Sequence, residues 1–110
     1  MKKEPYRDFA TECFRQYGLS IAEPQRARGA VERENVIAAA RAIDALSPEA
    51  RDAVYAVYIF GGEDVTRRGE IQRRVTEHAL RTFQCEDKVY RMLRIARDLC
   101  ATERGMKEKS

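Results

Sequence analysis

The chain has 110 residues, 35% charged and 44% hydrophobic, which is typical of one soluble domain that buries a core without disulfide or metal staples. No apolar run approaches the roughly 20 residues that span a bilayer, and the charges within "MKKEPYRDFATECF" do not match a signal peptide, so we expect a cytoplasmic protein without a membrane partner. Residues 1–64 hold nine Lys/Arg against eleven Asp/Glu, whereas residues 65–110 hold twelve against seven, which favours an anionic partner such as nucleic acid.

The N-terminal part predicts two helices. The first spans residues 6–17, and we expect Gly18 to end it, because glycine is a common residue at helix C-termini. Its apolar residues share one face, which could pair two copies of the chain in a homodimer. The second helix spans residues 31–46, and its many alanines favour helix and allow a neighbour to approach closely. The two apolar faces consist of Tyr6, Phe9, Ala10, Cys13, Phe14 and Tyr17, and of Val36, Ala39, Ala40, Ile43 and Leu46.

The segment "LSPEA" predicts the start of a third helix. Ser47 can cap its N-terminus, Pro48 suits its first position, and Glu49 favours the positive end of the helix dipole. An apolar stripe of Val54, Val57 and Phe60 predicts that this helix continues to Gly61–Gly62.

A fourth helix is predicted over residues 70–83, with Asp64 or Thr66 as candidate caps. Two pairs with favourable i,i+4 order, Glu70–Arg74 and Glu77–Arg81, explain part of its arginine content without a ligand. Four apolar residues spaced by four share one face of this helix: Ile71, Val75, Ala79 and Phe83.

The fifth helix is predicted over residues 86–103, ending before Gly105, and we expect residues 105–110 to form a disordered tail. Its apolar residues are Val89, Leu93, Ala96 and Cys100, flanked by Met92, Ile95 and Leu99. The opposite arc carries Tyr90, Arg91, Arg94, Arg97 and Arg104, with Asp98 as its one acid. Because this arc has few acids to neutralise it, an anionic partner is the simplest physical account of the face.

The side chains that carry most chemistry are few. Cys13, Cys85 and Cys100 form no C-x-x-C pair, and we expect three buried, reduced thiols. His78, the single histidine, lies at the edge of an apolar face, which favours a packed, partly buried ring. We therefore expect no metal site, no cofactor and no enzymatic activity.

These elements predict an all-α fold, a compact bundle of about five helices with a C-terminal helix-turn-helix. Residues 5–46 would form an N-terminal helical pair that buttresses a core of residues 47–104, all within a single domain 1–110. The helix-turn-helix hypothesis depends on "HALRTFQCEDKVYRMLR". In that motif a small residue of the first helix packs against an aliphatic residue ten positions later, a spacing that Ala79 and Val89 have, with Leu93 four residues further on.

More specifically, "LSPEARDAVYAVYIFGG" followed by "DKVYRMLRIAR" resembles the fourth region of bacterial sigma factors, which reads the upstream promoter element, and the small phage transcription regulators that reuse it. The resemblance covers about Leu46 to Ala101. Two departures are clear: the link "GGEDVTRRGEIQ" is longer than in that family, and Phe83 stands where glycine is usual, so we expect a looser turn or one of different shape.

The resemblance implies a sequence-specific, non-enzymatic regulator of transcription that binds double-stranded DNA. Cys85, Glu86 and Asp87 would lie at the leading end of the recognition helix, and Glu86 and Asp87 would repel phosphate unless one accepts from a cytosine amino group. The residues directed into the major groove would be Tyr90, Arg91 and Arg94, and phosphate contacts would come from Lys88, Arg97, Arg73, Arg74 or Arg81.

Two alternatives stay open at this point. One is a helical protein–protein adaptor that binds RNA polymerase or another regulator, which the acidic N-terminal half and the interface-favoured Tyr and Arg residues support. The other is an enzyme with an unfamiliar site. The target sequence, the sign of regulation and the oligomeric state do not follow from the sequence.

Overall fold

Helices make up the secondary structure of the computed structural model, which describes residues 6–60 and 65–106. Over these residues there are five α-helices, one π-helical turn and no strand, so the predicted all-α class is confirmed. None of these helices is long and apolar enough to cross a membrane. The elements are α1 (Arg7–Ala22), α2 (Ala30–Ala45), α3 (Pro48–Val54), the π-helical turn η1 (Tyr55–Ile59), α4 (Glu70–Thr82) and α5 (Glu86–Glu103).

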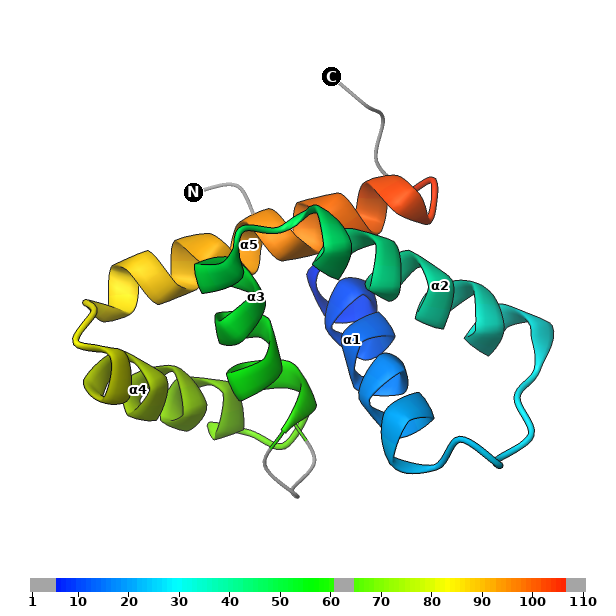
Figure 1. Ribbon diagram of the computed structural model, residues 1–110, viewed down its shortest axis with the longest axis horizontal. Coiled ribbons are helices and arrows are strands. Elements are labelled where there is room, and N and C mark those ends of the chain that lie inside the picture. The colour runs from blue at the N-terminus through cyan, green and yellow to red at the C-terminus, as the bar shows by residue number, and fades with distance from the viewer. Residues whose placement is uncertain (1–5, 61–64, 107–110) are drawn as a thin grey trace.

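The long helix α5 connects the two halves of the molecule (Figure 1). Helices α1 and α2 pack against each other beside the C-terminal half of α5, while α3 and α4 lie towards its N-terminal half. The radius of gyration of the Cα atoms is 13.4 Å, close to the ~13 Å expected for one folded domain of this size. Because α1 to α4 all pack on one side of α5, the other side of α5 faces outward.

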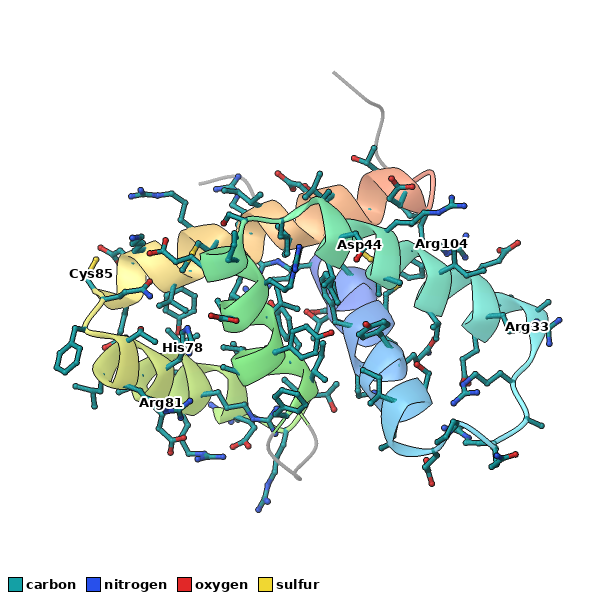
Figure 2. All side chains as sticks on the ribbon, in the orientation of Figure 1. Arg33, Asp44, His78, Arg81, Cys85 and Arg104 are labelled. Carbon is teal, nitrogen blue, oxygen red and sulfur yellow. The ribbon has the colours of Figure 1, made fainter. Side chains whose placement is uncertain are left out.

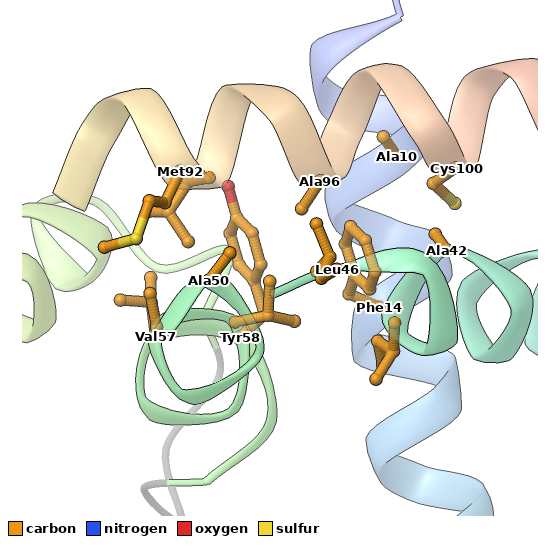
Figure 3. Packing of buried hydrophobic residues seen from close by; sticks show 14 of the residues in the cluster. Ala10, Phe14, Ala42, Leu46, Ala50, Val57, Tyr58, Met92, Ala96 and Cys100 are labelled. Carbon is orange, nitrogen blue, oxygen red and sulfur yellow. The ribbon is translucent and has the colours of Figure 1, made fainter. Parts of the chain in front are cut away.

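The core forms where these helices meet α5 (Figure 3). The ring of Phe14 stacks on that of Tyr58 with centroids 5.5 Å apart, and Phe14 is fully buried. Burying such a side chain contributes about 1.5–3 kcal/mol. The predicted stripe of α5 is confirmed in four fully buried residues, although Ile95, expected at its flank, is 48% exposed. Those four residues are Val89, Leu93, Ala96 and Cys100.

The prediction for the first helix was wrong at its C-terminus. Helix α1 continues through Gly18 to Ala22, and a Cβ at Gly18 would lie 3.4 Å from Cγ2 of Ile59. Gly18 therefore lies where α1 passes close to η1, and it does not end the helix. The apolar face of α1 that was considered for homodimerisation lies in the core, because Cys13 and Phe14 are fully buried.

The third helix begins as predicted but ends differently. The Ser47 hydroxyl accepts a hydrogen bond from the Ala50 amide at 3.2 Å, and Pro48 occupies the first turn. The backbone then widens into η1, where the Phe60 amide donates to the Tyr55 carbonyl at 2.8 Å. Phe60 is consequently 59% exposed, whereas Tyr58 is buried. The predicted end at Gly61–Gly62 lies outside the described residues.

Helix α4 begins at Glu70, as expected, but without either predicted cap. Gly69, in a left-handed conformation, precedes it; Thr66 is not at the cap position, and Asp64 lies outside the described residues. The predicted Glu70–Arg74 pair is present at 3.0 Å with both side chains buried. In the described part of the chain Glu77 pairs with Arg73, at 2.7 Å, and not with Arg81.

Helix α5 ends at Glu103, as predicted, and Gly105 lies in the turn that closes it. Gly105 has φ +77°, and the amides of Gly105 and Met106 donate to the carbonyls of Thr102 and Ala101. These bonds satisfy carbonyls that the helix end would leave unpaired. The first two residues of the expected disordered tail are therefore hydrogen-bonded, and residues 107–110 lie outside the described part of the chain.

Arg104 has a structural role that the helical wheel did not indicate. Its Nε donates to Oδ1 of the buried Asn35 at 2.7 Å, and Asn35 donates to Gln16 at 3.0 Å. The guanidinium also lies 5.6 Å from the ring centroid of Phe9. These contacts connect α5 to α2 and α1, so Arg104 belongs to an internal polar network and not to an open cationic face.

Candidate nucleic-acid interface

The segment that joins α4 to α5 places the leading end of α5 at one tip of the molecule, where Figure 2 labels Cys85. Phe83 closes α4 in a left-handed conformation with φ 56° and ψ 41°, and the Gln84 amide donates to the Ala79 carbonyl at 2.9 Å. Ala79 and Val89, ten residues apart, are both buried members of the core. The prediction of a looser or differently shaped turn was therefore wrong. Phe83 adopts the left-handed geometry that glycine would favour at this position.

The first turn of α5 is fixed by contacts to two other helices. Glu86 accepts a hydrogen bond from the Thr76 hydroxyl of α4 at 3.1 Å. Lys88 pairs with Glu49 at the start of α3, with 3.2 Å between Nζ and Oε2 and both side chains about half exposed. An exposed pair of this kind contributes at most ~1 kcal/mol. Lys88 can therefore exchange Glu49 for a phosphate at little cost.

Arg91 and Arg94 are the two predicted groove-reading residues that face outward. Both are exposed on α5. Within residues 6–60 and 65–106 neither makes a hydrogen bond or an ion pair with a carboxylate. Asp87, one turn before Arg91, is exposed on the same helix. Two guanidinium groups without internal partners thus lie within three turns of the tip.

Arg97 was placed wrongly on the cationic face. Its side chain is 8% exposed, and Nη1 donates to the hydroxyl of Tyr58 at 2.7 Å in the interior. The neighbouring turn of α5 contributes Leu93 and Ala96 to the core, so the guanidinium points along the boundary of the core towards η1. A phosphate contact by Arg97 would require the structure to open.

Arg74 was also wrong as a phosphate contact, because it is buried. Its Nε donates to Glu70, and its Nη1 donates to the Val57 carbonyl of η1 at 2.8 Å. Hydrogen bonds from Arg73 first, and then from Arg74, lower the pKa of the Glu70 carboxyl to about 2. The three charges form an internal cluster, although Arg73 itself is about half exposed.

Tyr90 is half-buried and packs against the core, so it does not belong to the outward face with Arg91 and Arg94. Burial, and then the Glu86 charge, raise the pKa of its hydroxyl. It lines a groove of about 660 Å³ together with the exposed Arg7 and with Arg67 and Arg68 of the turn before α4. Sequence reasoning missed these three cations; the adjacent arginines directly before a helix start were the available signal.

His78 lies on α4, where Figure 2 labels it, and its side chain is buried. Neither ring nitrogen has a hydrogen-bond partner among the described residues. Burial first, and then the charge of Arg81, lower the pKa of the imidazole. The ring lines a cleft of about 530 Å³ that also includes Asp52, Arg73 and the exposed Arg81. Arg81 makes no ion pair within the described residues.

The cysteines differ from the prediction in one position. Cys13 and Cys100 are buried and free, as expected, whereas the free Cys85 is exposed in the turn before α5. Over the described residues no group of three or more His, Cys, Asp or Glu side chains is arranged to hold a metal ion.

Comparisons with protein-family models, with characterised proteins and with solved structures gave no match to this chain. Its function therefore has to be argued from its own residues.

Proposed function

We propose that this chain is a sequence-specific DNA-binding regulator of transcription in which α4 and α5 act as a helix-turn-helix. In this arrangement the N-terminal half of α5 lies in the major groove, and α1–α3 hold it in place. The observation that carries the proposal is the pair Arg91 and Arg94, exposed on α5 near the tip and without a carboxylate partner in the described part of the chain. A duplex supplies the acceptors that these donors lack internally.

In this proposal the cations have different roles. Arg91 and Arg94 donate to base edges, where one bidentate arginine–guanine contact gives about 1–3 kcal/mol of discrimination. Lys88 and Arg81 contact phosphates, since Arg81 has no ion pair within the described residues and the Lys88–Glu49 pair is exposed. Arg73 can add a phosphate contact through its exposed half, whereas Arg97 and Arg74 act inside the fold.

A fluorescence-anisotropy titration against random duplex DNA at two salt concentrations, followed by selection of a preferred site, tests the proposal. R91A and R94A should each weaken binding to that site by about ten- to a hundredfold and reduce the preference over random duplex. R81A should weaken binding to all sequences and lower the salt slope by about one. The control is R33A, which removes an exposed arginine from α2 at the opposite end of the molecule (Figure 2). No binding at low salt by the folded protein would refute the proposal.

A second candidate function is a protein–protein adaptor, with RNA polymerase as the natural partner of a transcription regulator. Its supporting observation is a group of large apolar side chains that are more than half exposed on α1 and α2: Ile21, Val31 and Ile37. Size-exclusion chromatography of the chain with purified RNA polymerase tests this function. Co-elution that V31A or I37A abolishes would support it, and unchanged elution would exclude this partner.

A further inference from the structure

Phe83 combines a strained backbone with a fully exposed ring. Its φ of 56° is the single positive φ of a non-glycine residue among the described residues, and its side chain is 97% exposed. A side chain in the left-handed region brings its Cβ too close to the following carbonyl oxygen, so L-residues other than glycine, asparagine and aspartate rarely adopt it. The ring gains no burial that would offset this strain.

The end of α5 shows what the backbone alone requires at such a position. At Gly105 the same closure occurs, with Met106 donating to the Ala101 carbonyl five residues back at 2.8 Å; at Phe83 the corresponding bond is Gln84 to Ala79 at 2.9 Å. Glycine adopts this conformation without a steric penalty. The chain thus ends α5 with glycine in the left-handed conformation and ends α4 with phenylalanine, for which that conformation is unfavourable. No contact inside the described fold explains why phenylalanine occupies the end of α4.

The surroundings of the ring indicate what it contacts. Leu80, three residues earlier and near the C-terminal end of α4, is 73% exposed. Arg81, next to Leu80 in the chain, and Arg91, in the second turn of α5, are exposed and have no carboxylate partner among the described residues. The acids at the start of α5, Glu86 and Asp87, are both exposed, and Glu86 accepts a hydrogen bond from Thr76. Exposed apolar side chains that share these elements with exposed arginines complement a polyanion that also carries apolar groups.

We propose that Phe83 is a specificity-determining contact in which its ring, supported by Leu80, packs against the 5-methyl group of a thymine in the major groove. This inference rests on the proposed DNA-binding function. Thymine is the base that offers a methyl group there, and apolar side chains read it by contact. In this proposal the strained backbone at Phe83 lowers the stability of the fold, and it places the ring for a base contact beside the leading end of α5.

The test separates the backbone effect from the ring effect. F83G removes both the strain and the ring, F83N removes the ring but keeps a residue that tolerates the left-handed region, and F83L keeps the strain and an apolar contact. M106A, which shortens an exposed apolar side chain beyond the C-terminal end of α5, is the matched control. Each protein is measured by thermal unfolding and by anisotropy titration against the selected duplex and the same duplex with deoxyuridine at its thymidine positions.

We expect F83G to raise Tm by roughly 3–6 °C while weakening binding to the selected duplex about tenfold. F83N should weaken binding to a similar extent, and F83L by less than about threefold. Loss of one buried methyl corresponds to about fourfold, so the unaltered chain should prefer the thymidine duplex by about that factor, and F83G should lose the preference.

Two failures can be told apart. If the unaltered chain binds no DNA, the proposed function itself is wrong. If it binds DNA but F83G binds equally well, or if thymidine and deoxyuridine duplexes bind alike, the proposed function stands and Phe83 is not the thymine contact.

Discussion

Replacing Arg97 with alanine should destabilise the fold by about 3 kcal/mol, although the helical wheel alone groups it with Arg91. The Arg97 guanidinium donates to the buried Tyr58 hydroxyl at 2.7 Å, and a hydrogen bond with a charged partner contributes about 1.5–3 kcal/mol. Loss of the buried aliphatic stem adds ~1–2 kcal/mol, and relief from burying the charge offsets part of the sum. For a domain of this size ~3 kcal/mol lowers Tm by about 12 °C.

Urea denaturation followed by circular dichroism measures this difference, with R91A as the exposed control on the same helix. R91A should change the free energy of unfolding by less than ~0.5 kcal/mol, and R97M, which keeps an apolar stem, should recover part of the loss. In DNA titrations at a temperature where both variants are folded, R97A should bind the preferred site almost as tightly as the unaltered chain, and R91A about ten- to a hundredfold more weakly. If R97A and R91A have the same stability, the assignment of Arg97 to the interior is wrong.

Three further measurements follow from the structure. Burial and the charge of Arg81 lower the pKa of His78 below its usual value of 6.5, so below about pH 6.5 the unfolded chain binds a proton that the folded chain does not. The free energy of unfolding should therefore fall as the pH drops below about 6.5. In urea titrations H78Q should remove this part of the pH dependence, and identical pH profiles for H78Q and the unaltered chain would contradict the assignment. G18A places its Cβ in ordinary contact, 3.4 Å from Ile59, and should raise the free energy of unfolding by up to ~1 kcal/mol through helix propensity. G18L should lower it by about 1–3 kcal/mol through overpacking. Thermal unfolding in which G18A is less stable than G18L would refute this prediction. D87N removes a favourable charge at the start of α5 at a cost of about 0.3–1 kcal/mol, but it should tighten binding to random duplex several-fold at low salt, and an unchanged affinity would count against entry of this end of α5 into DNA.

The sequence was sufficient to locate the helices because the evidence for them is local. Each helix has an apolar stripe at the 3.6-residue period, and α5 buries the stripe that was predicted for it almost completely. The start at Ser47 and Pro48 and the end at Gly105 follow from side-chain and backbone chemistry within a few residues. Gly18 was misread because the feature that gives it its role, Ile59, is 41 positions away in the chain.

The candidate site was predicted less well, since a helical wheel gives the direction of a side chain but not its partner. Arg91 and Arg94 are exposed as predicted. Arg97 and Arg74, which were predicted to contact phosphates, are bound inside the fold by groups 39 and 17 residues away in the chain. Tyr90 is half-buried against the core, and it lines a groove with residues of α1 and of the turn before α4. Long-range partners of this kind leave no periodic signal in the sequence.

Both misplaced arginines have one origin, the π-helical turn η1. A regular α-helix extended from Val54 would bury Phe60, but the wider turn, with the Phe60 amide bonded to the Tyr55 carbonyl, changes the angle between successive side chains. Tyr58 consequently points into the core and presents its hydroxyl to Arg97, while the Val57 carbonyl at the end of the helix accepts from Arg74. A local change of five residues that no apolar period indicates thus withdraws two cations from the surface, and it leaves Arg91 and Arg94 as the outward-facing arginines of α5.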